Sequence, residues 1–87
     1  MQVMLESRGL TPHTYSLWEL VSREANDAGF LGISLKRIAI ECETSEPVEL
    51  ITELQSKEIV EVCTHVPSKD GDVVMLKLLV RARIARR

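Results

Sequence analysis

The sequence of 87 residues contains few aromatic residues, few cysteines and no long apolar run. A transmembrane helix needs about 20 consecutive apolar residues, and no stretch of this chain approaches that length. Tryptophan, tyrosine and phenylalanine occur once each, which is too few for a platform on which single-stranded bases stack. The first residues lack the basic and apolar regions of a signal peptide, so we expect none. These absences argue against a membrane protein and against a single-strand stacking protein.

The side chains that usually carry catalysis or hold metals are also sparse. Cys42 and Cys63 do not form a Cys-x-x-Cys motif, and with His13 and His65 they complete the set of soft metal ligands. No zinc-site spacing is present, so we expect no metal and no cofactor. No glycine-rich phosphate loop or nucleophile motif occurs. The sequence therefore predicts a binding protein rather than an enzyme, with reduced thiols in the cytoplasm or the nucleus.

The net charge of −2 is distributed unevenly along the chain. Residues 1–40 are balanced. Residues 41–61 contain seven glutamates and a single lysine, for a net charge of −6. Residues 62–87 contain two aspartates and six basic residues, for a net charge of +4. Such an asymmetry bears on the partners of a protein rather than on its fold.

Apolar residues at helical spacing predict three amphipathic helices. The first begins after Thr11, which is a favourable N-cap with proline at the next position, and ends before Gly29. Ser34 caps the second, whose apolar face runs from Leu35 to Cys42. The third opens at residue 45 or 46 and continues through residue 56. Residues 4–8 are compatible with a further short helix.

The apolar pattern changes its period near Ile59. Residues 59–66 are β-branched and roughly alternating, which predicts a strand. A turn over residues 67–72 contains an Asp-Gly hairpin signal, and residues 73–80 pair back as a second strand. Residues 30–33 are too short for a helix and are typical of an extended connector or a short strand.

This order of elements predicts one α+β domain over residues 1–87. We interpret it as a winged helix, in which three helices form the core and a C-terminal two-stranded hairpin forms the wing. Residues 1–10 are then an N-terminal extension. Residues 81–87 form a basic tail or a short helix.

Three segments resemble transcription regulators of the MarR type. Residues 9–20 resemble the Gly-Leu-Thr-Pro opening of the family, residues 33–39 resemble its second helix, and residues 50–60 resemble the exit of its recognition helix. The chain departs from the family where Glu58 replaces the usual glycine, and where Val73 and Val74 follow Asp72 in place of an Asp-x-Arg pattern. The resemblance implies a winged helix that binds double-stranded DNA, and it leaves a homodimer open.

We expect a DNA-binding form of this domain to contact backbone phosphates through the basic residues of the second helix, the wing and the tail. These residues are Lys36, Arg37, Lys69, Lys77, Arg81, Arg83, Arg86 and Arg87.

The predicted third helix favours a different partner. Its face opposite the core is expected to display three acids, Glu46, Glu49 and Glu53, together with Ser56 or Lys57. Each carboxylate that approaches a phosphate costs about 0.5–1 kcal/mol even at a water-like dielectric. This acidic face is either a solvated surface or, with Ile40 nearby, a site through which the domain docks onto a larger protein assembly as a subunit or as a small inhibitor. The sequence therefore leaves two partners open, DNA and protein.

Overall fold

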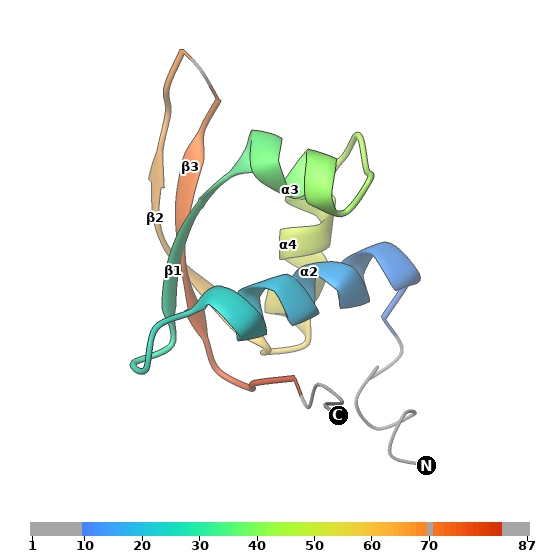
Figure 1. The fold of residues 1–87 in the computed structure, drawn as a ribbon, viewed down its shortest axis with the longest axis vertical. Helices are drawn as coiled ribbons and strands as arrows, with labels where there is room; N and C mark the ends of the chain where they lie inside the picture. Colours follow the sequence, from blue (N-terminus) through green and yellow to red (C-terminus); the bar gives the residue numbers. More distant parts are fainter. Residues whose placement is uncertain (1–9, 70, 83–87) are drawn as a thin grey trace.

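The computed structural model describes residues 10–69 and 71–82. The elements follow one another as α2 (Pro12–Glu24), β1 (Phe30–Ser34), α3 (Leu35–Glu41), α4 (Pro47–Ser56), β2 (Val60–Val66) and β3 (Val73–Leu78). Within these residues the fold is α+β, with three helices packed on one face of a three-stranded antiparallel sheet (Figure 1). The short helix predicted at residues 4–8 lies outside the described residues.

The helices begin where their sequence signals predict. The hydroxyl of Thr11 accepts a hydrogen bond from the backbone N–H of Thr14 (3.3 Å), and Pro12 takes the first helical position of α2. The hydroxyl of Ser34 accepts from the N–H of Arg37 (3.0 Å) and caps α3. The predicted start of α4 is confirmed by Pro47 in its first turn.

The first helix is shorter than the sequence predicts. It ends at Glu24 rather than just before Gly29, because Ala25 is already extended and the Asn26 side chain competes for the next backbone groups. The Asn26 amide oxygen accepts from the N–H of Ala28 (2.9 Å) and of Phe30 (3.0 Å). Asparagine often offers the backbone this alternative to a helix.

The sheet contains one strand more than the predicted two-stranded wing. The predicted hairpin of β2 and β3 is present, but β1 pairs with the other edge of β3, so the strand order is β1-β3-β2. Phe30 lies opposite Lys77 at one end of the β1–β3 pairing, and Ser34 lies opposite Val73 at the other. In β2 the register shifts between Val62 and Thr64. The extended segment at residues 30–33 is therefore a strand, and β3 is the centre of the sheet.

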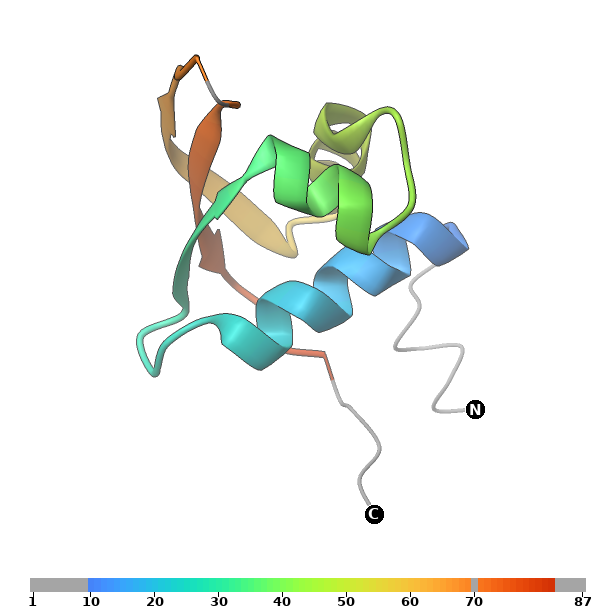
Figure 2. The same ribbon diagram turned by 45° about the horizontal axis from the view of Figure 1, so that its top comes forward.

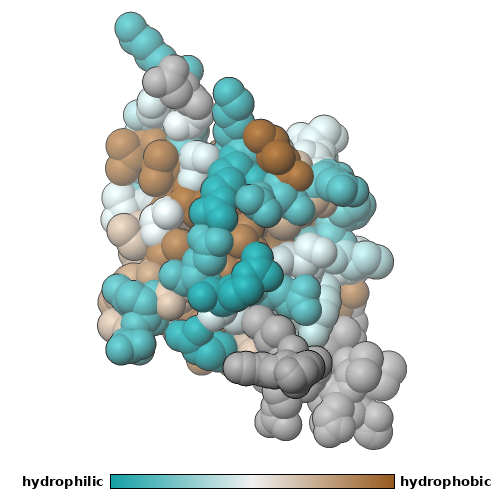
Figure 3. All heavy atoms as spheres, in the orientation of Figure 1, coloured by the Kyte–Doolittle hydropathy of each residue, from teal (hydrophilic) through white to brown (hydrophobic). Residues whose placement is uncertain are grey.

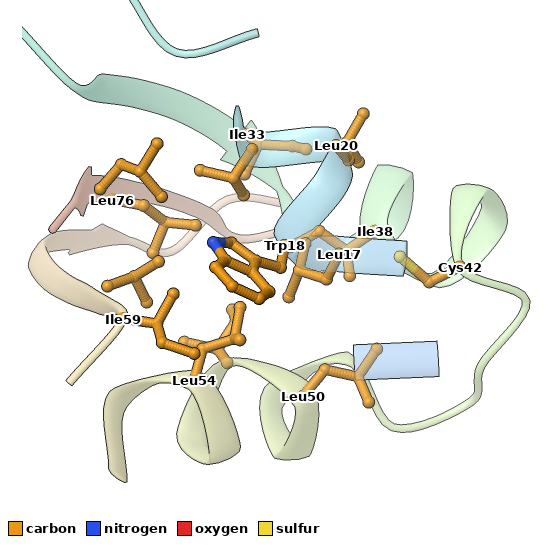
Figure 4. Close-up of a cluster of buried hydrophobic side chains, with 14 of the residues drawn as sticks. Leu17, Trp18, Leu20, Ile33, Ile38, Cys42, Leu50, Leu54, Ile59 and Leu76 are labelled. Carbon is orange, nitrogen blue, oxygen red and sulfur yellow. The ribbon is translucent and has the colours of Figure 1, made fainter. Parts of the chain in front are cut away.

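A single apolar core lies between the helices and the inner face of the sheet (Figures 1 and 4). Trp18 of α2 is at its middle and is only 2% exposed. Its indole N–H donates to the carbonyl of Val80 (2.7 Å), which fastens the segment after β3 to α2. The other fully buried large residues come from every helix and from the sheet: Leu17, Val21, Ile38, Leu54, Ile59, Val60 and Leu76.

Among residues 10–69 and 71–82, no helix packs against the outer face of the sheet. Four apolar side chains there are between 37% and 51% exposed: Phe30, Val66, Val73 and Met75. The turn that leads into β1 is close-fitting, because Gly29 has φ of +91° and its carbonyl accepts from the N–H of Leu78 (2.7 Å). A Cβ on Gly29 would lie 3.0 Å from the backbone oxygen of Leu78.

We expect Gly29→Ala to lower the free energy of unfolding by about 1–3 kcal/mol, because alanine disfavours a positive φ and its methyl meets backbone. Gly32→Ala is the matched control. A Cβ there would meet only the end of the Met75 side chain, at 3.5 Å, so stability is expected to stay within about 0.5 kcal/mol. Urea denaturation of both variants measures the difference, and equal destabilisation would contradict the close fit at Gly29.

Candidate functional site

The loop between β2 and β3 is held beside the start of α3. The backbone N–H of Leu35 donates to the carbonyl of Asp72 (2.8 Å). Gly71 lies so near α3 that a Cβ on it would be 3.5 Å from the Cβ of Lys36. Figure 2 shows α3 leaving β1 on the side of the molecule where the hairpin ends. The exposed Lys36 is therefore next to the hairpin loop, which carries the exposed Lys69.

A small polar cluster shapes this hairpin. The imidazole Nε2 of His65 donates to the carboxylate of Asp72 (2.8 Å), and the N–H of Ser68 donates to the second oxygen of Asp72 (3.3 Å). The hydrogen bond from His65, with a smaller contribution from Ser68, lowers the pKa of the Asp72 carboxyl. His65 lies in β2 and Asp72 directly precedes β3, so this hydrogen bond joins the two sides of the hairpin next to its loop.

The outward face of α4 is less acidic than the sequence suggests. Leu50, Ile51 and Leu54 face the core, and Glu49 is exposed as predicted. Glu53 points to the side instead, where its carboxylate accepts a hydrogen bond from the hydroxyl of the fully buried Thr14 of α2 (2.7 Å).

Glu46 is exposed at the cap position before α4, and its side chain makes no capping hydrogen bond there. The predicted stripe of three glutamates is thus reduced to one carboxylate within the exposed face of the helix. The other members of that face are uncharged: Val48, Thr52, Gln55 and Ser56. Helical spacing from the core positions predicts this face and places Ser56 on it, and the same spacing is the signal for Val48, Thr52 and Gln55.

Arg37 of α3 forms ion pairs with one carboxylate of α2 and one of α3. Its guanidinium donates two hydrogen bonds to the carboxylate of Glu24 (2.7 and 2.6 Å), and its Nε lies 3.5 Å from the carboxylate of Glu41. The hydrogen bond from Arg37 lowers the pKa of Glu24. The positive charge of this predicted phosphate contact is therefore balanced by two glutamates of the same chain.

Lys77 and Arg81 lie away from the hairpin loop. Lys77 is on the outer face of the sheet, opposite Glu61 in β2 and with its ammonium 5.7 Å from the centre of the Phe30 ring. Arg81 donates to the carbonyl of Ser22 and to the carbonyl of Asn26 (3.4 Å), at the C-terminal end of α2. Figure 1 shows this last segment passing the end of the molecule opposite the loop. Arg83, Arg86 and Arg87 lie outside the described residues.

Ile40 is 67% exposed on α3, and Val48 on α4 is 54% exposed. Figure 3 shows a hydrophobic patch among hydrophilic residues over α3. The exposed acids Glu41 and Glu43 follow Ile40 in the chain, and Glu43 has a positive φ of 54°. The exposed aliphatic side chains therefore lie at the end of α3 and the start of α4, and the connection between these helices carries exposed carboxylates.

The soft ligands are spread across the fold. Cys42 is buried, which raises the pKa of its thiol, and its carbonyl accepts from Nδ1 of His13 (2.8 Å). Cys63 is exposed in β2, where the register of the strand shifts. Among residues 10–69 and 71–82, no three His, Cys, Asp or Glu side chains are arranged to hold a metal ion. The same part of the chain contains no pocket.

No helix in the described part of the chain has the length and apolar character to span a bilayer. No protein-family model matches the sequence, and no curated protein or solved structure is significantly similar to it.

The His65–Asp72 pair generates a prediction on pH. Because the pKa of Asp72 is lowered in the folded protein, its contribution to stability is present above the ordinary pKa of aspartate and is lost as the pH falls through the lowered value. We expect His65→Ala to raise the pKa of Asp72 toward its ordinary value, because alanine has no donor to replace the imidazole. Titration of the Asp72 carboxyl carbon by NMR measures the change, with Thr64→Ala as the control. An unchanged titration in His65→Ala would contradict the role of the pair.

Proposed function

We propose that the domain is a winged helix that binds double-stranded DNA without catalysis. In this proposal α3, the connection over residues 42–46 and α4 form the helix-turn-helix, and β2 with β3 forms the wing. The order of the elements and the packing of α2, α3 and α4 on one face of the sheet support it. The third strand β1 completes the sheet without covering α4.

One observation carries the proposal: the hydrogen bond from Thr14 to Glu53. In a DNA-bound winged helix the recognition helix enters the major groove, where several exposed carboxylates would meet phosphate repulsion. Because Glu53 is turned toward α2, the face of α4 that would enter the groove contains one carboxylate and four uncharged residues. The Glu53 carboxylate keeps its charge but is directed away from the groove, so two of the three predicted carboxylates, Glu46 and Glu49, remain exposed at the start of the helix.

Lysines lie at positions from which they would reach the phosphates on either side of such a groove. Lys36 is beside the hairpin loop, Lys69 is in that loop, and Lys57 follows the last turn of α4. All three are exposed, and none is in an ion pair in the described part of the chain. Arg37 and Arg81 are less suitable than the sequence suggested, since carboxylates or backbone carbonyls already bind their guanidinium groups.

The proposal predicts a salt-dependent affinity that rests on Lys36 and Lys69. For duplex DNA the slope of log affinity against log salt is about −0.9 per phosphate contacted. We expect Lys36→Ala/Lys69→Ala to weaken binding and to make this slope about 1.8 units less steep. Fluorescence anisotropy with a random-sequence duplex, between about 50 and 200 mM salt, measures both quantities.

Lys77→Ala is the matched control, since it removes the same charge from the outer face of the sheet, and its slope should equal that of the wild type. A chain that ends at Ala82 lacks Arg83, Arg86 and Arg87 but keeps Arg81, which binds backbone carbonyls at the end of α2. Its affinity for the duplex therefore tests the contribution of the three removed arginines. A wild-type slope in Lys36→Ala/Lys69→Ala would contradict the role of these two lysines beside the hairpin loop. Absence of binding at the lowest salt would refute DNA binding altogether.

A second function is favoured by the exposed Ile40 and by the acids around it. In this alternative the connection between α3 and α4 docks onto a protein assembly, with Ile40, Glu46 and Glu49 in the interface. Glu53 would contribute less, because its carboxylate is bound to Thr14.

The protein-docking alternative predicts that a partner recovered by pull-down is lost in Ile40→Asp and in Glu49→Lys. It should be retained in Glu61→Lys, which introduces the same charge change on the outer face of the sheet. Loss of the partner in all three variants would point to a general effect of charge and would count against this interface.

A further inference from the structure

The exposed face of α4 has an unusual set of side chains for reading bases. Residues 47–56 contain neither lysine nor arginine. Arginine or lysine on guanine is the commonest base-specific contact in the major groove. If α4 is the reading helix, as the proposed function requires, it therefore makes this contact nowhere along its length.

Exposed side chains that could contact bases occur along the whole length of α4. Val48 and Glu49 lie in its first turn, Thr52 follows one turn later, and Gln55 lies in the last turn. At about 1.5 Å per residue these positions span roughly 10 Å, the length of about three base pairs. Ser56 contributes less, because its hydroxyl already donates to the carbonyl of Glu53 (2.8 Å). The N-terminal residues of a recognition helix are the ones that usually reach the base edges.

Glu49 is the decisive residue among them. A carboxylate only accepts hydrogen bonds, and the N4 amino group of cytosine is the donor in the major groove with no acceptor on the same base edge. Guanine presents N7 and O6, which are both acceptors and repel a carboxylate. In the described part of the chain, Glu49 makes no ion pair and no hydrogen bond through its side chain. Its carboxylate is therefore available to a ligand.

The exposed residues next to Glu49 on α4 favour contact with thymine. The methyl groups of Val48 and Thr52 lie on the same exposed side of α4 as Glu49, and Val48 is 54% exposed. Threonine and aliphatic methyl groups pack against the C5 methyl of thymine. The exposed lysines at 36, 57 and 69 supply positive charge that complements the phosphates, and Glu49 is the one carboxylate within the exposed face of α4.

We infer that α4 reads a short pyrimidine-rich stretch of duplex DNA, in which Glu49 selects a cytosine and Val48 and Thr52 contact thymines. This inference rests on the proposed function and adds its sequence preference. The strand that faces α4 carries no guanine at these positions.

The test is selection from a duplex library with a randomised window, using the wild-type chain, Glu49→Gln and Glu49→Ala. In the wild-type selection one position should prefer cytosine over the other bases by on the order of tenfold. In Glu49→Gln that position should change to adenine, because a glutamine amide pairs with adenine N6 and N7. In Glu49→Ala it should lose its preference, while the other positions stay the same.

Glu61→Gln is the matched control, since it removes the same charge from the outer face of the sheet and should keep the cytosine. Enrichment of guanine, or a cytosine preference that survives in both Glu49 variants, would overturn the inference. Binding that depends on salt and on the lysines but enriches no base would also overturn it, while the proposed function stands. Absence of any duplex binding would be a failure of the proposed function itself.

Discussion

The pairing of β1 with β3 is the constraint on which the rest of the arrangement depends. It makes β3 the central strand, and it fixes Ser34, the cap of α3, opposite Val73 at the hairpin end of the sheet. Since α3 starts directly after β1, its first residues must lie beside the hairpin loop. The hydrogen bond from Leu35 to Asp72 closes this junction. The position of α4 follows, because a short connection joins it to α3 and its apolar face must reach the same core.

Intramolecular contacts change the electrostatic character that the sequence suggests. The chain divides its charge into an acidic middle and a basic end, yet in space several of these charges are bound by other elements. Glu24 and Glu41 bind Arg37, the carbonyl of Ser22 binds Arg81, and Thr14 binds Glu53. What remains exposed on α4 is a face with the single carboxylate of Glu49, and the exposed residues around it are of both signs: Lys36, Lys57 and Lys69, and Glu43, Glu46 and Glu58.

The sequence predicts most of the helices and strands, but it does not predict which of them pair or pack with one another. Helix starts at Thr11 and Ser34 and the hairpin after Ile59 depend on local signals, and the structure contains them. The early end of α2 depends on the Asn26 side chain, which apolar spacing does not record. The pairing of residues 30–34 joins strands that are far apart in the chain, so a short segment containing glycine gave no indication of it.

Contacts between residues that are distant in the chain also explain why the observed surface differs from the predicted one. Helical spacing places Glu53 beside the core face of α4, but only the packing of α2 against α4 shows that Thr14 is there to bind it. Arg37 and Arg81 have partners on α2 that are distant in sequence, and no local pattern announces them. Lys36 and Lys69 are exposed, as a phosphate contact requires, and neither forms an ion pair in the described part of the chain.

The single tryptophan of the chain is almost fully buried, and its indole binds the carbonyl of Val80. One chromophore therefore touches the first described helix, the core and the segment that leaves the sheet. Release of that last segment would free the indole N–H and admit water to the ring, even with the helices still in place. The intrinsic emission spectrum thus reports local opening at the end of the domain, in addition to its complete denaturation.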